Sequence, residues 1–331
     1  MATVRDMMPT FELYQPARID DAIALLDRQG SAAWVLAGGM DSLDWFKDRI
    51  KRPQAVIDLS QISELKGIQA HADGVDIGAM TTLTEVVMHP LMQSQYALLA
   101  QAARTVATPQ IRHQGTLGGN ISQDTRCWYY RSGMPCYRAG GSTCYADTPT
   151  AMNREHCLFE ADRCVAVSPS DTAPALIALD ATMVIRNAKG ERQVPAEEYF
   201  IGPSVDITRM TVLQPGDLLT TIRLPKTWAK ARFYFEKVSD RQAWDFPLVN
   251  VAAALRLEHQ VIQDMRLVVG GVACRPLRLK AVEDSVRGER PSRDTAELAG
   301  KTAIWDARPL NHNHFKVPLL KNLVQRAIRE V

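Results

Sequence analysis

The stretch 111–121 reads Ile-Arg-His-Gln-Gly-Thr-Leu-Gly-Gly-Asn-Ile, and it opens the segment around which the rest of the chain is organised. Glycine lets a backbone approach a ligand closely and adopt positive φ, and Thr116 and Asn120 add short polar side chains. Five of the six cysteines follow, from Cys127 to Cys164, and the segment closes on Ser-Pro-Ser-Asp at 168–171. A turn suited to phosphates beside a cysteine-rich loop predicts two redox groups side by side.

A second glycine turn lies much earlier in the chain. The apolar run Ala-Trp-Val-Leu at 33–36 predicts a buried strand, and Ala-Gly-Gly-Met-Asp-Ser-Leu follows it at 37–43. A strand, a glycine turn and a helix start point several backbone N–H groups outward, which favours a phosphate. Two such turns predict a grip on one pyrophosphate from two sides, although two structural turns would have the same pattern. The fingerprint G-x-G-x-x-G does not occur, which argues against a Rossmann NAD site.

The composition sets outer limits on function. A length of 331 residues suggests two or three domains, and 46% hydrophobic with 23% charged residues is ordinary for a soluble globular protein. A net charge of +2 gives no reason to expect nucleic acid or an anionic membrane as a partner. The sequence has no recognisable signal peptide and no apolar run long enough for membrane insertion. We therefore expect a cytoplasmic protein with reduced thiols, unless a signal-bearing partner exports it.

The cysteine spacing indicates a metal group. The gaps between successive cysteines are wide, without the short Cys-x2–4-Cys pairs of structural zinc sites. Wide gaps fit a loop around a cubane iron–sulfur cluster, which needs four thiolates. The loop is poor in aliphatic residues, so a metal would help to hold it together. Zinc and free thiols remain alternatives, His113 and His156 are weaker ligand candidates, and Cys274 is interpreted as a small buried hydrophobe.

The element pattern predicts an α+β fold. A helix is expected at 19–29, strands at 33–36, 56–59, 75–80 and 218–224, and a hairpin at 182–194, with Thr81 or Thr82 as a helix cap. From residue 232 the pattern changes to an antiparallel meander at 232–238, 249–257, 261–269 and 271–273. Helices at 277–286, 293–302 and 315–329 follow it, so a separate C-terminal α+β domain is predicted.

Five motifs carry a family resemblance: 37–43, Ile-Gly-Ala-Met-Thr at 77–81, 115–121, 168–171, and Gly-Gly-Val-Ala at 270–273. Their order resembles that in FAD-binding medium subunits of the xanthine dehydrogenase family, over essentially the whole chain. The resemblance implies a two-lobed FAD-binding domain of the PCMH/vanillyl-alcohol-oxidase type, with lobes at 1–60 and 61–227. It also implies a C-terminal medium-subunit flavoprotein domain at 228–331.

The cysteine loop, an insertion at about 124–166, narrows the resemblance to those members of the family that have a similar loop. It is similar to the loop of the 4-hydroxybenzoyl-CoA reductase β subunit and of periplasmic-type aldehyde oxidoreductase medium subunits, which carry an extra 4Fe–4S cluster. This likeness implies Cys127, Cys136, Cys144 and Cys164 as the cluster ligands, and it leaves Cys157 as the spare cysteine.

The resemblance also places FAD between the two lobes and implies no catalytic residue in this chain. Backbone N–H groups of residues 38–43 would hold the pyrophosphate, while Met40 replaces the threonine usual in the family. A strand end exposed to solvent remains the alternative interpretation of Lys237. The residues assigned to FAD are Ala37, Gly38, Gly39, Met40, Asp41, Ser42, Leu43, Thr81, Thr116, Gly118, Gly119, Asn120, Ser170, Asp171, Leu218 and Lys237.

The implied function depends on partners. Substrate would react on a large molybdenum-cofactor subunit, a small subunit would carry two 2Fe–2S clusters, and this chain would exchange electrons with an external carrier, ferredoxin-like or other. The resemblance also allows a dimer of heterotrimers. Two alternatives remain: a self-contained flavin oxidase of the same superfamily, and a zinc-stabilised binding module. The substrate of the whole enzyme and the direction of electron flow are left open by the sequence.

Overall fold

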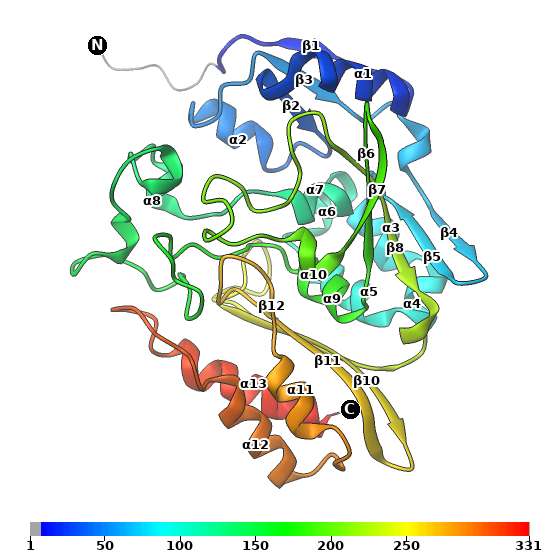
Figure 1. The fold of residues 1–331 in the computed structure, drawn as a ribbon, viewed down its shortest axis with the longest axis vertical. Helices are drawn as coiled ribbons and strands as arrows, with labels where there is room; N and C mark the ends of the chain where they lie inside the picture. Colours follow the sequence, from blue (N-terminus) through cyan, green and yellow to red (C-terminus); the bar gives the residue numbers. More distant parts are fainter. Residues whose placement is uncertain (1–7, 331) are drawn as a thin grey trace.

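The computed structural model describes residues 8–330 and holds three sheets that follow one another along the chain (Figure 1). The first sheet has three parallel strands in the order β1 (Glu12–Tyr14), β3 (Ala55–Asp58) and β2 (Ala33–Leu36). Helix α1 (Ile19–Gln29) shares a core with β3, and helix α2 (Ser42–Lys47) follows β2 directly. The predicted helix at 19–29 and strand at 33–36 are therefore confirmed.

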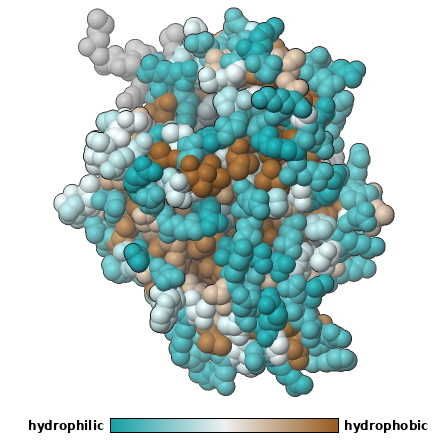
Figure 2. Space-filling model, in the orientation of Figure 1, coloured by the Kyte–Doolittle hydropathy of each residue, from teal (hydrophilic) through white to brown (hydrophobic). Residues whose placement is uncertain are grey.

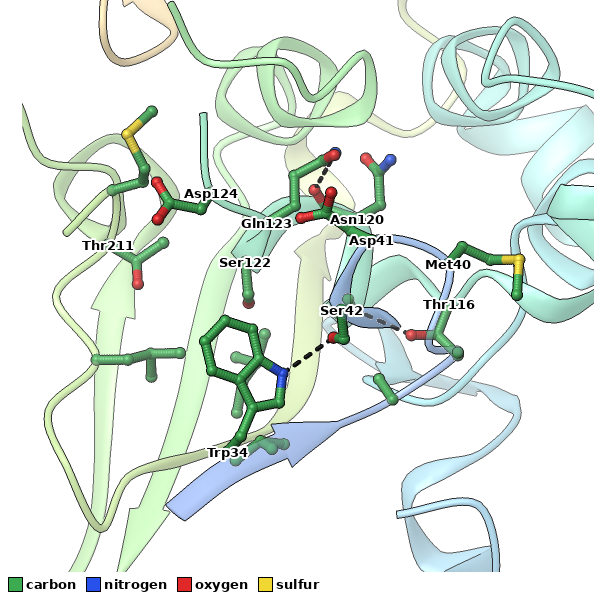
Figure 3. A pocket seen from close by; sticks show the side chains of 18 of the residues that line it. Trp34, Met40, Asp41, Ser42, Thr116, Asn120, Ser122, Gln123, Asp124 and Thr211 are labelled. Carbon is green, nitrogen blue, oxygen red and sulfur yellow. Dashed lines mark hydrogen bonds between the residues drawn. The ribbon is translucent and has the colours of Figure 1, made fainter. Parts of the chain in front are cut away.

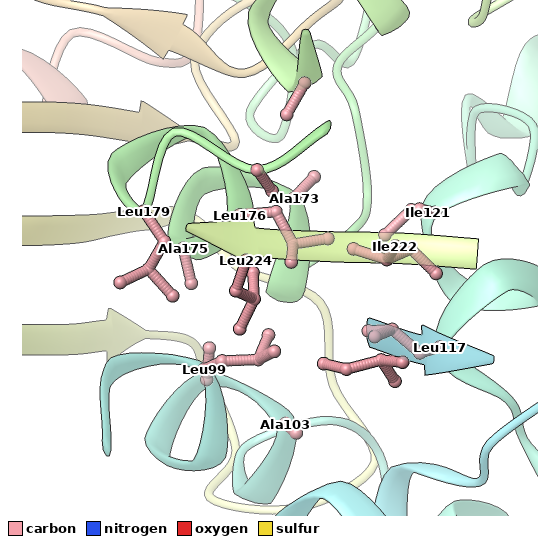
Figure 4. Close-up of a cluster of buried hydrophobic side chains, with 14 of the residues drawn as sticks. Leu99, Ala103, Leu117, Ile121, Ala173, Ala175, Leu176, Leu179, Ile222 and Leu224 are labelled. Carbon is pink, nitrogen blue, oxygen red and sulfur yellow. The ribbon is translucent and has the colours of Figure 1, made fainter. Parts of the chain in front are cut away.

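The second sheet has five antiparallel strands. Their order is β4 (Ile68–His71), β5 (Gly74–Gly78), β8 (Leu218–Pro225), β6 (Thr182–Asn187) and β7 (Gly190–Pro195). The helices after β5 are α3 (Leu83–Met88), α4 (Pro90–Gln95) and α5 (Ala97–Arg104), and α9 (Thr172–Ala178) and α10 (Ala196–Tyr199) flank β6 and β7 in sequence. Leu99 of α5, Leu176 of α9 and Ile222 of β8 belong to the largest core (Figure 4).

The predicted cap before α3 is present in full. Thr82 Oγ1 accepts a hydrogen bond from the Glu85 N–H, and the Glu85 carboxylate accepts one from the Thr82 N–H. The chain then continues through α6 (Pro109–Gln114), α7 (Leu117–Ser122) and α8 (Trp128–Arg131) into the cysteine loop, which contains short turns of 3₁₀ helix at Tyr137–Ala139 and Tyr145–Asp147. Further 3₁₀ turns lie at Gly30–Ala32, Ser63–Leu65 and Lys226–Trp228.

The third sheet is antiparallel, in the order β12 (Leu277–Arg278), β11 (Val261–Gly270), β10 (Val249–Glu258) and β9 (Arg232–Val238). Strand β10 is buried on both faces, because Val251 and Ala253 join the core under the C-terminal helices while Ala252 joins the core of the second sheet. The C-terminal helices are α11 (Lys280–Val286), α12 (Arg293–Ala303) and α13 (Lys316–Arg329). This double burial explains the apolar run at 251–255 within β10.

One predicted element of this domain is wrong, and one predicted helix begins later than expected. Residues 271–273 form no strand, because Gly271 has φ of +74° and turns the chain at the end of β11. The helix predicted from residue 277 begins at Lys280, since Leu277 and Arg278 pair with β11 first. The α+β class itself is confirmed.

The face in Figure 2 is largely hydrophilic, with apolar side chains gathered in a band below the lobe that carries the N-terminus. Within residues 8–330, no helix combines the length and the apolar character that crossing a membrane requires.

Candidate functional site

The two glycine turns line one cavity of about 870 Å³ (Figure 3). Residues 37–42 reach it from the end of β2, and residues 115, 116 and 118–120 reach it from the start of α7. A Cβ on Gly38 would lie 2.2 Å from the Gln114 carbonyl oxygen, so the two turns are in direct backbone contact. The volume is within the range of small-molecule and cofactor sites.

Asn120 is held so that its amide nitrogen is left for a ligand. Its Oδ1 accepts hydrogen bonds from Ser170 Oγ at 2.6 Å and from Thr172 Oγ1 at 2.7 Å. An amide oxygen has two lone pairs, so both are used, and the two N–H donors of Nδ2 remain at the cavity lining. The hydroxyl of Thr116 caps α7 by accepting from the Gly119 N–H at 3.1 Å.

The side chain of Asp41 is committed to protein contacts. Its Oδ2 accepts from Trp45 Nε1 at 2.9 Å, and its Oδ1 accepts from Arg126 Nη1 at 2.5 Å and from Arg131 Nη2. The neighbouring Ser42 hydroxyl accepts from Trp34 Nε1 at 2.9 Å (Figure 3). At the first turn, a ligand would therefore meet backbone N–H groups and the exposed Met40 more than polar side chains.

The cavity brings together most of the residues assigned to FAD by resemblance, and four of them lie outside its lining. Thr81 is fully buried, where its hydroxyl is hydrogen-bonded to the N–H and C=O of Gly67. Ser170 touches the cavity through Asn120 rather than directly. The assigned residues that line the cavity are Ala37, Gly38, Gly39, Met40, Asp41, Ser42, Thr116, Gly118, Gly119, Asn120, Asp171 and Leu218; those outside it are Leu43, Thr81, Ser170 and Lys237.

Lys237 does not line the cavity itself, but it contacts Asp171, which does. Its Nζ forms an ion pair with Asp171 at 2.7 Å and also donates to the carbonyl oxygens of Thr105 and Asp245. Asn250 donates to the other Asp171 oxygen at 3.0 Å. All of these side chains are buried, and burial raises the pKa of Asp171 against the opposing effect of Lys237. The cluster joins the cavity wall to β9 and β10 of the third sheet.

Sequence reasoning missed residues from three other parts of the chain. Arg126, directly before Cys127, lines the cavity, and its guanidinium lies 4.6 Å from the centre of the Phe246 ring. Trp244 and Phe246 belong to the loop between β9 and β10 and also line the cavity. Lys51 and Arg52 contribute positive charge from the first lobe. Only the tertiary fold places these side chains at the site. The sequence shows that Arg126 directly precedes Cys127, but it does not show that Arg126 lines the cavity.

The cysteines gather in one region without forming a site for a single metal ion. Burial raises the pKa of the Cys127 thiol to about 12, and the thiols of Cys164 and Cys144 are near enough to add to the rise. A hydrogen bond from Cys274 lowers the pKa of Cys164 to about 6. Among the described residues, no group of three or more His, Cys, Asp or Glu is arranged to hold a metal ion. The 4Fe–4S cluster is therefore not supported by this geometry and stays a prediction.

The cysteine loop is held by the C-terminal domain. Asn313 Nδ2 donates to the carbonyl oxygens of His156 and Cys157, at 3.0 and 2.9 Å, and Lys316 Nζ donates to the same His156 oxygen at 3.0 Å. The amide of Asn311 donates to the carbonyls of Thr148 and Pro149. These contacts tie the loop to the C-terminal domain through protein groups, and the contribution of a metal to its order stays a prediction.

The two parts of the chain match two family models. Residues 9–227 match the FAD-binding domain in molybdopterin dehydrogenase, and residues 234–331 match the carbon monoxide dehydrogenase flavoprotein C-terminal domain. The gap between the two matches, residues 228–233, contains the start of β9, where the third sheet begins.

Several named proteins are similar over nearly their full length. The carbon monoxide dehydrogenase medium chain of Hydrogenophaga pseudoflava is 28% identical and covers 97% of this chain and 96% of its own. The FAD-binding subunit of an aldehyde oxidoreductase from Escherichia coli is 30% identical, with 96% and 97% covered. A solved structure of the Hydrogenophaga enzyme, lacking the Mo-pyranopterin moiety, superposes with a TM-score of 0.78 at 27% identity over 97% of both chains. The chain therefore belongs to the FAD-binding medium subunits of the molybdenum hydroxylase and carbon monoxide dehydrogenase family of oxidoreductases.

Proposed function

We propose that this chain is an electron-transfer subunit that carries FAD and a 4Fe–4S cluster within a heteromeric molybdenum-cofactor oxidoreductase. It relays electrons between the 2Fe–2S clusters of a small subunit and an external carrier, while substrate reacts on a large molybdenum subunit. The relatives named medium chain support a multi-subunit assembly. A cytoplasmic location is part of the proposal.

The FAD half of the proposal is supported by the chemistry of the cavity. The two glycine turns present backbone close to a ligand, and the amide nitrogen of Asn120 adds fixed donors. Lys51, Arg52 and Arg126 add positive charge that suits a pyrophosphate. When bound, the flavin supplies one- and two-electron redox chemistry. The residues of this chain bind and orient it, and Trp244 and Phe246 line the same cavity.

The cluster half of the proposal is supported by the donor set. Cys127, Cys144 and Cys164 perturb one another electrostatically, so their sulfurs lie in one neighbourhood. A cubane separates its thiolates more widely than a single ion does, so a spread group of sulfurs suits it better than zinc. Cys136 packs in the neighbouring cluster with Tyr130, against which Cys127 also packs. The proposed ligands are Cys127, Cys136, Cys144 and Cys164.

One observation carries the proposal: the two sites meet at consecutive residues. Arg126 lines the flavin cavity, and Cys127 is the first proposed cluster ligand. The pair of Arg126 with Asp41 also ties the cysteine loop to the glycine turn after β2. Electron transfer between a flavin and a cluster needs a short separation, and the adjacency of Arg126 and Cys127 supports this part of the proposal.

Anaerobic purification of the chain with its co-expressed partner subunits tests this function. We expect flavin absorption, co-purification of a large and a small subunit, and about eight iron atoms per heterotrimer, about four of them on the small subunit's 2Fe–2S clusters. The variant Cys144→Ser should lose about four of these iron atoms, and the matched control Cys157→Ser should keep all of them. Zinc in place of iron would overturn the cluster. Turnover by the isolated chain, without partners, would favour the self-contained oxidase instead.

A further inference from the structure

The loop between β9 and β10 presents two aromatic side chains to the cavity. Trp244 is 66% exposed and Phe246 is 39% exposed, and both line the cavity. Among residues 8–330, neither belongs to a hydrophobic core. A single exposed apolar side chain needs no explanation, but two aromatic rings, two residues apart and in the wall of one cavity, are typical of a surface that a ligand covers.

Backbone hydrogen bonds hold Trp244 in its position. Its φ of +54° lies in the left-handed region, which is an outlier for a bulky residue and costs conformational free energy. The Trp244 N–H donates to the carbonyl oxygen of Ala107 at 3.0 Å, and the Trp244 carbonyl oxygen accepts from Arg241 Nη2 at 2.8 Å. Lys237 Nζ donates to the carbonyl oxygen of the next residue, Asp245, at 2.7 Å. A fixed backbone therefore presents the exposed indole.

The cavity has a buried lining and an exposed lining in different parts of the chain. In the first lobe it is lined by Leu26 and Leu59, which are 2% and 3% exposed, and in the C-terminal domain by the exposed Trp244 and Phe246. FAD has two flat ring systems, adenine and isoalloxazine, that are joined through its pyrophosphate. With the pyrophosphate at the glycine turns, the two rings need different places in the cavity. The isoalloxazine ring must exchange electrons with a partner outside the cavity, so it belongs at the exposed lining.

We propose that Trp244 and Phe246 are binding residues for the isoalloxazine ring of FAD. This inference rests on the FAD half of the proposed function. Aromatic side chains bind a flat ring through the area that the contact buries and through the complementary charge distributions of the two π systems. The guanidinium of Arg126 lies 4.6 Å from the centre of the Phe246 ring and forms an ion pair with Asp41, so it links this ring to the first glycine turn.

Fluorescence of the bound flavin in the metal-free, full-length chain tests the proposal. An indole in contact with an excited isoalloxazine ring donates an electron to it and then recovers that electron, which quenches the emission without net chemistry. At equal flavin content, Trp244→Leu should therefore raise the emission per bound FAD severalfold. Because Trp244 is exposed and lies outside every core of the described residues, this variant should fold as the wild type does. Trp244→Phe keeps an aromatic contact without the indole, so it should raise the emission and retain the affinity for FAD.

Trp34 supplies the matched control. Within the part of the chain that the structure describes, Trp34 and Trp244 are the two tryptophans that line the cavity, and Trp34 belongs to β2 of the first lobe. Trp34→Phe should leave the emission as in the wild type. Unchanged emission in flavin-loaded Trp244→Leu, or a rise in Trp34→Phe, would overturn the proposal.

Calorimetric titration of the flavin-free chain separates the two rings of FAD. ADP carries the adenine and the pyrophosphate but no isoalloxazine ring. We expect Trp244→Leu to weaken FAD binding about tenfold and to leave ADP binding unchanged, because one aromatic contact contributes about that factor. Equal weakening of both ligands would place the adenine at Trp244 and overturn this inference alone. A wild-type chain that binds no FAD would overturn the FAD half of the proposed function with it.

Discussion

The flavin cavity and the cysteine loop lie side by side but are built in different ways. The cavity is made by backbone, because glycine turns touch each other and few side chains at the first turn are free for a ligand. The cysteine loop is made by side chains from elsewhere, because Asn311, Asn313 and Lys316 reach its carbonyls from the C-terminal domain. The cavity therefore depends on the close approach of two backbone turns. The order of the cysteine loop depends on hydrogen bonds from the C-terminal domain.

This difference separates the two sites energetically. A glycine substitution should damage the cavity while the loop keeps its contacts to the C-terminal domain. A substitution near α13 should loosen the loop while the flavin stays bound. The ion pair between Arg126 and Asp41 connects the two sites, so a substitution that breaks it should affect both.

The largest effect is expected for Gly38→Ala. Its new Cβ would lie 2.2 Å from the Gln114 carbonyl oxygen and 2.9 Å from the Gly115 Cα, so the two turns must move apart. We expect loss of bound flavin and a free energy of unfolding lower by about 3 kcal/mol, as in overpacked cores. Flavin absorbance and chemical denaturation measure both. In the control Gly202→Ala, the new Cβ would meet only the Glu160 side chain, at an ordinary contact distance of 4.0 Å, so this variant should behave as wild type. Full flavin content in Gly38→Ala would show that the turns can separate freely.

The next effect is expected for Asn313→Ala, in the other site. This buried amide accepts from the Leu310 N–H at 2.6 Å and donates to two carbonyls of the cysteine loop, so its loss leaves several buried groups unpaired. We expect a cost of about 2–3 kcal/mol and faster proteolysis within 146–158, with flavin retained. The control is Asn322→Ala, an exposed asparagine on helix α13, which follows Asn313 in the chain. Loss of flavin together with loop order would contradict the separation of the two sites.

The two sites also differ in how far the sequence predicts them. The strand–glycine turn–helix pattern at 33–47 and the cap at Thr82 are local, so propensity and spacing were enough to predict them. The contacts of Asn313 and Lys316 join residues about 160 positions apart, and their side chains carry no local signal. Arg126 and Phe246 could not be predicted for the same reason, because they line the cavity from separate loops. The strand predicted at 271–273 failed because Gly271 turns the chain there.

The pH dependence of stability gives a further prediction for the cysteine loop, through its contact residue Lys316. Burial depresses the pKa of Lys316 to about 7, so the folded metal-free chain holds this proton less tightly than the unfolded chain does. The unfolded state then binds more protons above pH 7, and stability rises with pH. Between pH 7 and 9 we expect a gain of about 2 kcal/mol in wild type that is absent from Lys316→Met. Urea unfolding at several pH values measures it. Parallel stability curves for the two proteins would contradict the buried charge.

The smallest effect is expected for Met40→Thr, back in the flavin cavity. Met40 is 45% exposed at the first glycine turn, where a threonine hydroxyl would add one donor to a site otherwise made of backbone. A single hydrogen bond contributes about 1 kcal/mol, so FAD should bind roughly five-fold more tightly. Fluorescence titration of the flavin-free chain measures this, with Met152→Thr, exposed on the cysteine loop, as the control. Unchanged affinity would mean that the backbone of the turn already satisfies the phosphate, and weaker affinity would mean that the methionine itself packs on the cofactor.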